Sequence, residues 1–406
     1  MTPHAMAVVR EIASVLAATL CVTAATYYIV ALRCARKFFR PRRAAPTCSS
    51  AESITILKPV CGLDRGAYEN FASFCRQRYP AFQIVFGSER ADDPGLAVAR
   101  RVARDFPGVD VRFVVHTGPA TPNPKVGLLA ALAAQARYPL LLVSDSDIRV
   151  GPHHLRTLVG PMADSRVGVV TCLYRSQAKG FAGCLDALGL TTDFQPSVLV
   201  ARELEGISFG MGSGTLVRAA ALAAGGGFEA IGDFLADDYL LGHLPVRAGY
   251  RAELAHEVVE HELDVTSLAQ VVRHQIRWNR GIRAMRPRGY AGLMLTQGVP
   301  ASLLLIALAG ALPHAWALVA ATIGLRFGMA WFVGVRCLKD DVARRALWLL
   351  PLRDLMTFGL WVTGFFGSSV VWRGRRLWLA SGGRLRAEAP ASAQTQPELV
   401  ESGFAS

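Results

Sequence analysis

The sequence predicts an α/β fold with a mostly parallel sheet, flanked by membrane-crossing helices. Between residues 53 and 290, short apolar runs alternate with helical stretches of about a dozen residues, which is typical of βαβ units covered on both faces. Outside that range lie long stretches without charge, at 12–32 and 289–325. With 52% hydrophobic and 18% charged residues, the chain is more apolar than a soluble enzyme, in which roughly a quarter of residues are charged.

The first 33 residues are predicted to be a transmembrane helix. Ile12 to Leu32 is a run of 21 uncharged residues, enough to cross a bilayer at about 1.5 Å per residue. A cleaved signal peptide is the alternative, but the apolar part is long and no small-residue cleavage site follows it. A basic linker (34–52) comes next. Because positive charge beside a spanning helix stays in the cytoplasm, the following domain is expected to face the cytosol.

The region 53–290 is predicted to be one globular domain. Its helical stretches lie at 67–79, 93–106 and 125–138, and its strands at 54–60, 82–89, 111–116, 140–145 and 167–174. In open α/β sheets, ligands bind beyond the carboxyl ends of the strands. Polar residues that directly follow these strands are therefore the candidates for a site.

The region 291–372 predicts two or three further crossings. Gly289 to Leu325 is a run of 37 uncharged residues in which Pro313 and His314 mark a hairpin. The third candidate, 355–372, is either a crossing or a re-entrant or interfacial segment. A crossing there would export basic residues, against the positive-inside tendency.

Two further features of the C-terminal region raise questions. Arg326 lies near the middle of an expected span, where a charge is costly unless it faces protein or headgroups. The last part of the chain (373–406) is expected to be a basic and then disordered tail. The net charge of +13 lies largely beside the crossings, where Lys and Arg meet anionic headgroups, so nucleic-acid binding is not predicted.

The stretch "LLLVSDSDIRV" (140–150) places two acids directly after a buried strand. Asp145 and Asp147 stand one residue apart at the predicted carboxyl end. Hard cations such as Mg²⁺ and Mn²⁺ prefer oxygen ligands and share them with phosphate. An isolated D-x-D is most often a solvated turn, but this position favours a metal–diphosphate site.

Other stretches carry candidate residues with structural alternatives. Asp92 and Asp93 follow the second strand, and Asp237 and Asp238 precede an apolar run; helix capping would explain either pair. The segment 273–283 holds four arginines around Trp278 and alternatively is a membrane-facing helix. The glycine-rich segment 208–228 is either a loop beside the acceptor cleft or a packing element. The segment 185–207 is either a membrane-surface helix or a buried one.

In order, Asp-Asp-Pro, Asn-Pro-Lys, Asp-Ser-x-Ile-Arg-Val, Asp/Glu-Asp-Tyr and Arg-Trp resemble the motifs of processive-type family 2/21 glycosyltransferases. The likeness is greatest to the ceramide glucosyltransferase family and its bacterial hopanoid-biosynthesis relatives. "SDSDIRVGP", "VGVVTCLYR", "ADDYLLG" and "RHQIRW" especially resemble the hopanoid N-acetylglucosaminyltransferase branch. The resemblance runs from the N-terminal helix to about residue 310.

The resemblance implies a GT-A fold and an inverting transfer of glucose or N-acetylglucosamine from a UDP-sugar to a hydroxyl of ceramide or a hopanoid polyol. It also implies an integral protein of a bacterial inner membrane. The metal, Mg²⁺ or Mn²⁺, would be held by Asp145 and Asp147, and Asp238 would be the catalytic base. The nucleotide sugar would meet Lys58, Asp93, Lys125, Asp145 and Arg277. The acceptor would meet Asp237, His274 and Trp278, although His274 departs from the Gln or Arg usual at that position, which leaves its role open.

Elementary chemistry agrees with these roles. A departing diphosphate gains negative charge, which a cation and an arginine stabilise. A lipid hydroxyl needs a carboxylate within about 3 Å to accept its proton. A polymerising polysaccharide synthase is the alternative enzyme, but it would need more spans after the Arg-Trp motif. A non-catalytic transporter or receptor would lack acids that this chain has.

Overall fold

The computed structural model describes residues 2–41, 52–118, 121–310, 312–372 and 375–386. Within them, the main sheet has eight strands in the order β3-β2-β1-β4-β7-β6-β8-β5. Strands β1 to β4 run parallel to one another, as do β6 and β8, whereas β7 and β5 run antiparallel to their neighbours. The predicted α/β class with a mostly parallel sheet is confirmed. The strands are β1 (Ile54–Pro59), β2 (Phe82–Ser88), β3 (Asp110–Val115), β4 (Leu140–Val143), β5 (Ile148–Arg149), β6 (Val167–Gln177), β7 (Thr215–Arg218) and β8 (Arg251–Glu262).

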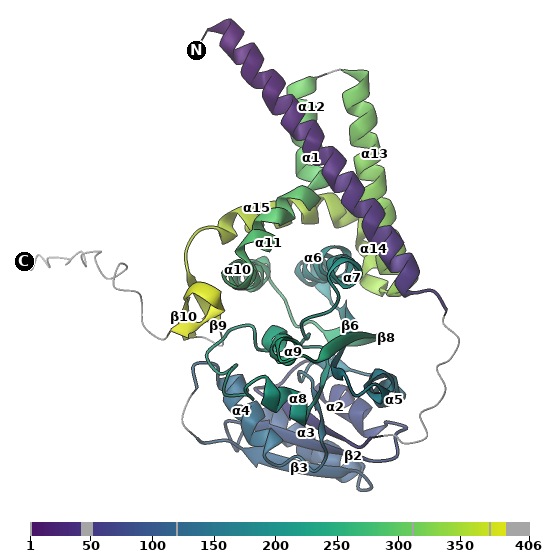
Figure 1. The fold of residues 1–406 in the computed structure, drawn as a ribbon, viewed down its shortest axis with the longest axis vertical. Helices are drawn as coiled ribbons and strands as arrows, with labels where there is room; N and C mark the ends of the chain where they lie inside the picture. The colour runs from purple at the N-terminus through teal and green to yellow at the C-terminus, as the bar shows by residue number, and fades with distance from the viewer. Residues whose placement is uncertain (1, 42–51, 119–120, 311, 373–374, 387–406) are drawn as a thin grey trace, which may run out of the picture.

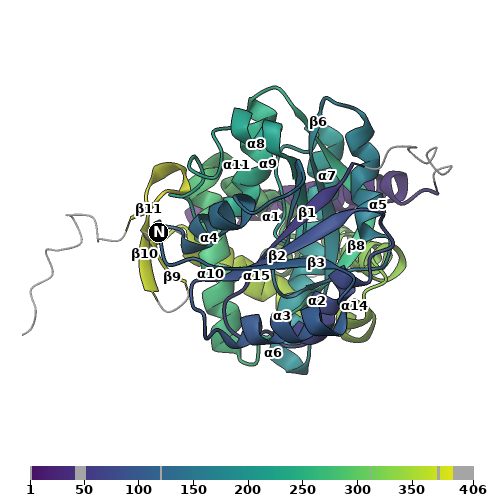
Figure 2. The ribbon, with the colours of Figure 1, turned by 90° about the horizontal axis from the view of Figure 1, so that it is seen from below.

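Helices cover both faces of the sheet because its strands are apolar on both sides. In β1, Ile54 and Ile56 join one core and Leu57 joins the other. Figure 2 shows α2 and α3 on one side of β2 and α8 and α9 on the other. The first core is completed by α2 (Ala67–Cys75), α3 (Pro94–Asp105) and α5 (His154–Val159), and the second by α4 (Pro124–Ala133), α8 (Ala219–Ala224) and α9 (Asp237–Arg247).

Three apolar helices extend away from the sheet as one bundle (Figure 1). The described residues contain two helices long and apolar enough to cross a membrane, α1 (Pro3–Phe38) and α13 (Pro313–Ala330) with its π-helical extension to Cys337. A third crossing results if the pair Pro287–Thr296 and Gly298–Ala309, bent by 55°, forms one span. It contains α11 (Pro287–Gly292) and α12 (Gly298–Ala309), and α12 and α13 form the expected hairpin. The protein is therefore a membrane protein by the composition of these helices.

Helix α1 is longer than the segment 1–33 that was expected to cross the membrane. Helix α1 continues to Phe38, so the first residues of the expected linker are helical, and residues 42–51 of that linker lie outside the described residues. At about 1.5 Å per residue, a helix of 36 residues is about 54 Å long, well beyond a hydrocarbon core of about 30 Å. Its C-terminal half packs on the catalytic domain through Phe38, whose ring stacks on His256 with centroids 4.2 Å apart.

The segment 355–372 does not form a third spanning helix. Helix α15 (Leu350–Gly364) has 15 residues and lies across the lower ends of the membrane helices (Figure 1). Its exposed side carries an apolar stripe, with Trp348 72% and Phe366 68% exposed at the two ends. A stripe at helical spacing on a helix beside membrane spans is typical of an interfacial helix. The whole stripe is Trp348, Leu352, Leu355, Val362 and Phe366.

After α15 the chain folds back onto the catalytic domain. Residues 369–386 form a small antiparallel sheet of β9 (Ser369–Trp372), β10 (Arg375–Leu379) and β11 (Leu385–Arg386). The Leu385 N–H donates to Asp233 O at 2.6 Å and fixes β11 beside the domain. Residues 375–386, the basic first part of the expected tail, are therefore folded, and the part expected to be disordered falls within 387–406, which lie outside the described residues. This return also removes the conflict with the positive-inside tendency.

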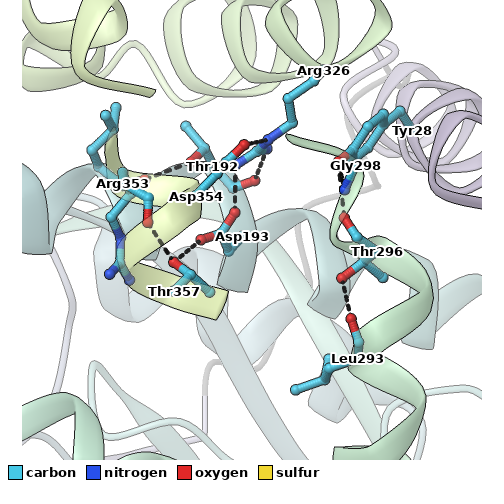
Figure 3. A network of polar contacts seen from close by, with 11 residues as sticks. Tyr28, Thr192, Asp193, Leu293, Thr296, Gly298, Arg326, Arg353, Asp354 and Thr357 are labelled. Atoms are coloured by element: carbon cyan, nitrogen blue, oxygen red, sulfur yellow. Dashed lines mark hydrogen bonds and ion pairs between the residues drawn. The ribbon is translucent and has the colours of Figure 1, made fainter. Parts of the chain in front are cut away.

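Arg326 faces protein rather than lipid, and is only 2% exposed. Its guanidinium pairs with Asp354 of α15 at 2.6 and 2.9 Å and with Asp193 at 2.6 Å, and it donates to Thr192 O at 2.8 Å (Figure 3). Thr192 and Asp193 belong to a π-helical turn (Leu190–Phe194) between α6 (Gly180–Gly189) and α7 (Gln195–Leu204). Segment 185–207 is thus a buried helical element, and Arg326 joins it to α13 and α15.

Candidate active site

The D-x-D acids lie at the carboxyl end of β4, as predicted, and are held there by two neighbours. The Asp145 N–H donates to Gly212 O at 3.2 Å. Lys125, at the start of α4, reaches Asp145 Oδ1 at 2.7 Å and Asp237 Oδ2 at 3.0 Å. One lysine therefore joins the acid after β4 to an acid at the start of α9.

Asp238 lies on the other side of the same glycine. The Gly212 N–H donates to Asp238 Oδ2 at 3.2 Å, so a single residue binds Asp145 through its carbonyl and Asp238 through its N–H. Asp238 Oδ1 accepts only the N–H of the adjacent Tyr239, at 2.8 Å. The cap of α9 is Ala236, so helix capping does not account for this acid. The glycine-rich segment thus belongs to the site.

Asp147 contacts β8 through its side chain. Its Oδ2 lies 3.2 Å from Nε2 of His261, whose Nδ1 lies 2.9 Å from Ser176 Oγ. Asp147 Oδ1 is buried and has no hydrogen-bond partner among the described residues. A buried carboxylate oxygen without a partner is costly, which makes this atom available to a cation.

Lys58 lies beneath the D-x-D turn and is fully buried in β1. Its Nζ donates to Asp145 O at 2.5 Å and to Ser144 Oγ at 3.3 Å, and it lies 3.9 Å from the ring centroid of Phe74. Burial lowers the pKa of Lys58 to about 7, although Asp147 and Asp145 oppose that shift. Lys58 positions the acidic turn, and its expected contact with a nucleotide stays a prediction.

Asp93 caps α3, which was the structural alternative for this pair of acids. Its Oδ1 accepts from the N–H groups of Gly95 and Leu96 at 2.9 and 3.3 Å, and its Oδ2 accepts from Gly62 N–H at 2.8 Å. The last bond ties the loop after β1 to the loop after β2. The expected contact of Asp93 with a nucleotide stays a prediction.

Burial and like charges separate the acids into two electrostatic classes. Burial, with Asp237 as the next contributor, raises the pKa of Asp238 to about 6. Burial also raises the pKa of Asp145, although Lys125 opposes the shift. For Asp147, burial opposes ionisation, but the contact with His261 and the charges of Lys58 and Lys125 together hold the pKa below its usual range. The electrostatics thus favour the charged form of Asp147, whereas the pKa of Asp238 lies closer to neutral pH.

The Arg-Trp motif lies on α10 (Leu268–Met285), between the sheet and α15 (Figure 1). His274 Nδ1 lies 3.1 Å from Asp186 Oδ2, and the His274 ring lies 4.6 Å from that of Trp278. Arg277 is half-buried on the same helix. The Trp278 ring packs near that of Phe194, with centroids 6.4 Å apart, and Phe194 in turn packs near Tyr174.

Tyr174 connects this aromatic group to the acids. Burial raises its pKa well above the usual range, and the charges of Asp238, Asp147 and Asp145 raise it further. The Tyr174 ring also lies 5.9 Å from the ring of His261, the partner of Asp147. The segment 273–283 is not simply membrane-facing either, because Arg283 donates to Gly367 O at 2.7 Å.

A divalent cation fits this site if a nucleotide completes its coordination. Among the described residues, no three His, Cys, Asp or Glu side chains converge as a complete metal site. Asp147 Oδ1 is nevertheless buried and without a partner among the described residues, and Asp145 stands two positions earlier in the chain. Mg²⁺ in particular is usually bound by one or two carboxylates together with substrate phosphates.

Gly212→Ala should disrupt the site without unfolding the domain. A Cβ at this position would lie 2.5 Å from Asp145 Oδ2, which is closer than van der Waals contact allows, and 3.7 Å from Asp238 Oδ2. We expect the activity of the site to fall at least about tenfold, because misplacement of catalytic groups is costly. Steady-state kinetics together with thermal unfolding measure both effects, and Gly151→Ala, which has open space around its Cβ, is the matched control. The prediction would be contradicted if Gly212→Ala melted so early that loss of folded protein accounted for the whole loss of turnover.

Three residues of this site had no sequence signal that singled them out. His261 and Tyr174 lie on parallel neighbours β8 and β6, in strands whose pattern predicts only a buried sheet. Asp186 stands in an apolar helix and is identified as a partner of His274 only by tertiary contact. A buried acid in an apolar segment was the one available hint.

Comparison with known proteins agrees with the geometry. The sequence profile described as "Glycosyl transferase family 21" matches residues 16–385. The chain belongs to glycosyl transferase family 21. As a member it is an enzyme that transfers sugar, and the family agrees with the GT-A class expected for its mostly parallel sheet.

Curated relatives of this family 21 chain include ceramide glucosyltransferases. It is 25% identical to ceramide glucosyltransferase 1 of Caenorhabditis elegans over 359 residues, which cover 86% of this chain and 75% of the relative. It is 32% identical to the ceramide glucosyltransferase of Komagataella phaffii over 145 residues, or 32% of this chain and 28% of the relative. Among solved structures, a mannosyltransferase from Pyrobaculum calidifontis in complex with GDP-Man and Mn²⁺ matches with a TM-score of 0.48 and 17% identity, over 86% of this chain and 99% of that one.

Proposed function

We propose that this family 21 enzyme transfers glucose or N-acetylglucosamine from a UDP-sugar to a hydroxyl of a membrane lipid, with inversion and with a divalent cation. The lipid is ceramide or a hopanoid polyol. The observation that carries the proposal is the convergence of Asp145 and Asp238 on Gly212, beside Asp147 and below a membrane-crossing bundle.

Each acid has a distinct role in this proposal. Asp145 and Asp147 would hold Mg²⁺ or Mn²⁺, which neutralises charge on the departing UDP. Lys125 holds the Asp145 and Asp237 carboxylates in place. Asp238, with its raised pKa, accepts the proton of the attacking hydroxyl. No second carboxylate nucleophile is required for a direct displacement with inversion.

The membrane arrangement supports a lipid acceptor. Helix α10, which carries His274 and Trp278, lies between the acids and the interfacial helix α15. An acceptor hydroxyl at the bilayer surface would approach the acids from this side. The basic residues that follow the apolar part of α1 favour a cytoplasmic catalytic domain, in a bacterial inner membrane.

The proposal is tested with membranes that contain the protein. They are incubated with labelled UDP-glucose or UDP-N-acetylglucosamine, together with ceramide or a hopanoid polyol. We expect label in an organic-soluble product with inverted anomeric configuration. Label only in a water-soluble polymer would instead support a polysaccharide synthase, and no transfer from either donor would overturn the proposal.

Asp147→Ala is expected to weaken metal and UDP binding together. The substitution removes the unpartnered Oδ1 and the charge that His261 stabilises. Calorimetric titration of UDP with and without Mn²⁺ should show that the metal-dependent part of the affinity falls at least about tenfold, and EDTA should abolish that part in the wild type. Asp92→Ala, which removes an exposed acid paired with Arg90, is the control. Retained metal-dependent UDP affinity in Asp147→Ala would place the cation elsewhere.

A further inference from the structure

Arg353 is a buried arginine that the proposed chemistry does not use. It lies on the inner side of α15 and is only 3% exposed. Its Nε and Nη1 are buried and have no hydrogen-bond partner among the described residues. An arginine is always charged and carries five N–H donors, so burying two of its nitrogens without partners is costly. A hydrogen-bond acceptor that binds there would offset this cost.

The guanidinium of Arg353 is held in a defined place. It lies against Gly189 at the end of α6, where any Cβ would overlap it. Figure 3 shows the side chain pointing away from the neighbouring Arg326 network, with no dashed line at its guanidinium. The guanidinium therefore takes no part in that network, although the Arg353 carbonyl accepts from Thr357 and the neighbouring Asp354 pairs with Arg326.

Its surroundings point toward the acceptor side of the active site. The charge of Arg353 contributes to lowering the pKa of Asp186, after burial and the contacts of Asp186 with His274 and Gln275. Arg353 lies against Gly189 of α6, about one turn after Asp186, and Asp186 contacts His274, one of the predicted acceptor residues.

The charge balance identifies the kind of ligand. Arg326 carries one positive charge against two negative charges on Asp193 and Asp354, so Arg353 brings the local total to neutral. Asp186 adds a further negative charge nearby. A diphosphate would meet no net positive field at this position. A neutral hydroxyl or amide oxygen would accept hydrogen bonds from the unpaired N–H groups of Arg353 without adding charge.

We propose that Arg353 binds the head group of the acceptor lipid, by donating hydrogen bonds from its unpaired Nε and Nη1 to a neutral hydroxyl or amide oxygen. This assignment rests on the proposed function and deepens it, since it places the specificity for an oxygen-bearing neutral lipid on α15. Arg353 is a positioning residue for the acceptor hydroxyl and does not itself take part in bond breaking.

The test uses the full-length protein in nanodiscs and two measurements. Binding of a fluorescent short-chain ceramide and of a hopanoid polyol is measured without any sugar donor, and KM is measured separately for lipid and for UDP-sugar. In Arg353→Gln we expect the Kd and KM for lipid to rise about tenfold, as expected for loss of hydrogen bonds from a charged donor, with KM for UDP-sugar changed less than about twofold.

Two further variants separate binding from folding. Gly189→Ala displaces the guanidinium but keeps its charge, and should weaken lipid binding in the same selective way. Arg344→Gln, an exposed arginine on the neighbouring α14 (Asp341–Ala346), should change neither measurement. Arg353→Lys keeps the charge but not the planar fork, and should recover only part of the affinity.

Three results would overturn the assignment. One is unchanged lipid binding in Arg353→Gln, with or without a lower melting temperature, which would make Arg353 only a counter-charge. Another is a rise in KM for UDP-sugar alone, which would place the diphosphate there. The third is a wild-type protein that binds neither lipid probe. Failure of sugar transfer would instead count against the proposed function, because lipid binding is measured without a donor.

Discussion

Asp238→Asn is expected to lower kcat by about 10²- to 10⁴-fold, the contribution of a positioned general base. The amide keeps the size of the side chain and can still accept the Gly212 N–H, so the fold should be retained. Affinity for UDP and metal should change little, because those are assigned to Asp145 and Asp147. Initial rates at saturating donor and lipid measure the loss.

The same residue predicts a pH dependence. The pKa of Asp238 is raised to about 6 by burial and by Asp237, and only the deprotonated acid can accept a proton. Below pH 6, kcat of the wild type should therefore fall about tenfold per pH unit, and it should level off above pH 7. The residual activity of Asp238→Asn should lack this acidic limb. Asp233→Asn, an exposed acid of the preceding loop, is the isosteric control. Wild-type kinetics in Asp238→Asn would assign the base to another group.

Arg326→Met is expected to be the most destabilising single substitution in the membrane-proximal half of the described chain. It removes the cation that pairs with Asp354 and Asp193, and Asp354 stays buried without compensation. Breaking a buried ion pair from one side costs about 3–5 kcal/mol. Thermal unfolding of the purified protein in nanodiscs should show a large fall in melting temperature.

The double variant Arg326→Met with Asp354→Asn should recover part of that loss, because it also removes the uncompensated charge. Arg336→Met, which removes an exposed arginine from the same helical segment, should leave the melting temperature nearly unchanged. Equal melting temperatures for Arg326→Met and Arg336→Met would show that the Arg326 network does not stabilise the fold.

Local periodicity was sufficient to predict the sheet that carries the site. The apolar runs ending at Val143 and Ser88 are strands β4 and β2, and the acids that follow them lie at the predicted edge. The position of Asp145 follows directly from the rule that ligands bind beyond the carboxyl ends of parallel strands. Asp238 begins helix α9, almost a hundred positions later, and that rule does not predict its place. The family motifs added the expectation that Asp238 joins them, which the Gly212 contacts now support.

Tertiary contacts explain what the sequence could not predict. The partner of Asp147 is His261, on a strand more than a hundred residues later. The run without charge at 355–372 indicates an apolar segment, but it does not say whether that segment crosses the membrane. In the structure its first half belongs to α15, across the lower ends of the membrane helices, and its last residues form β9. The energetic cost of a charge at Arg326 could be predicted from the sequence. The acid that offsets this cost, Asp354, lies on α15, and only the tertiary structure brings the two together.

Because α15 turns an apolar stripe outward beside the spanning helices, an enzyme with the proposed lipid acceptor would meet it by lateral diffusion within a sheet of lipid. Encounter then depends on the mole fraction of acceptor among neighbouring lipids rather than on its concentration in the aqueous suspension. Diluting the vesicles with buffer should leave the rate per enzyme unchanged. Diluting the acceptor with inert phospholipid should slow it, as expected for kinetics confined to two dimensions.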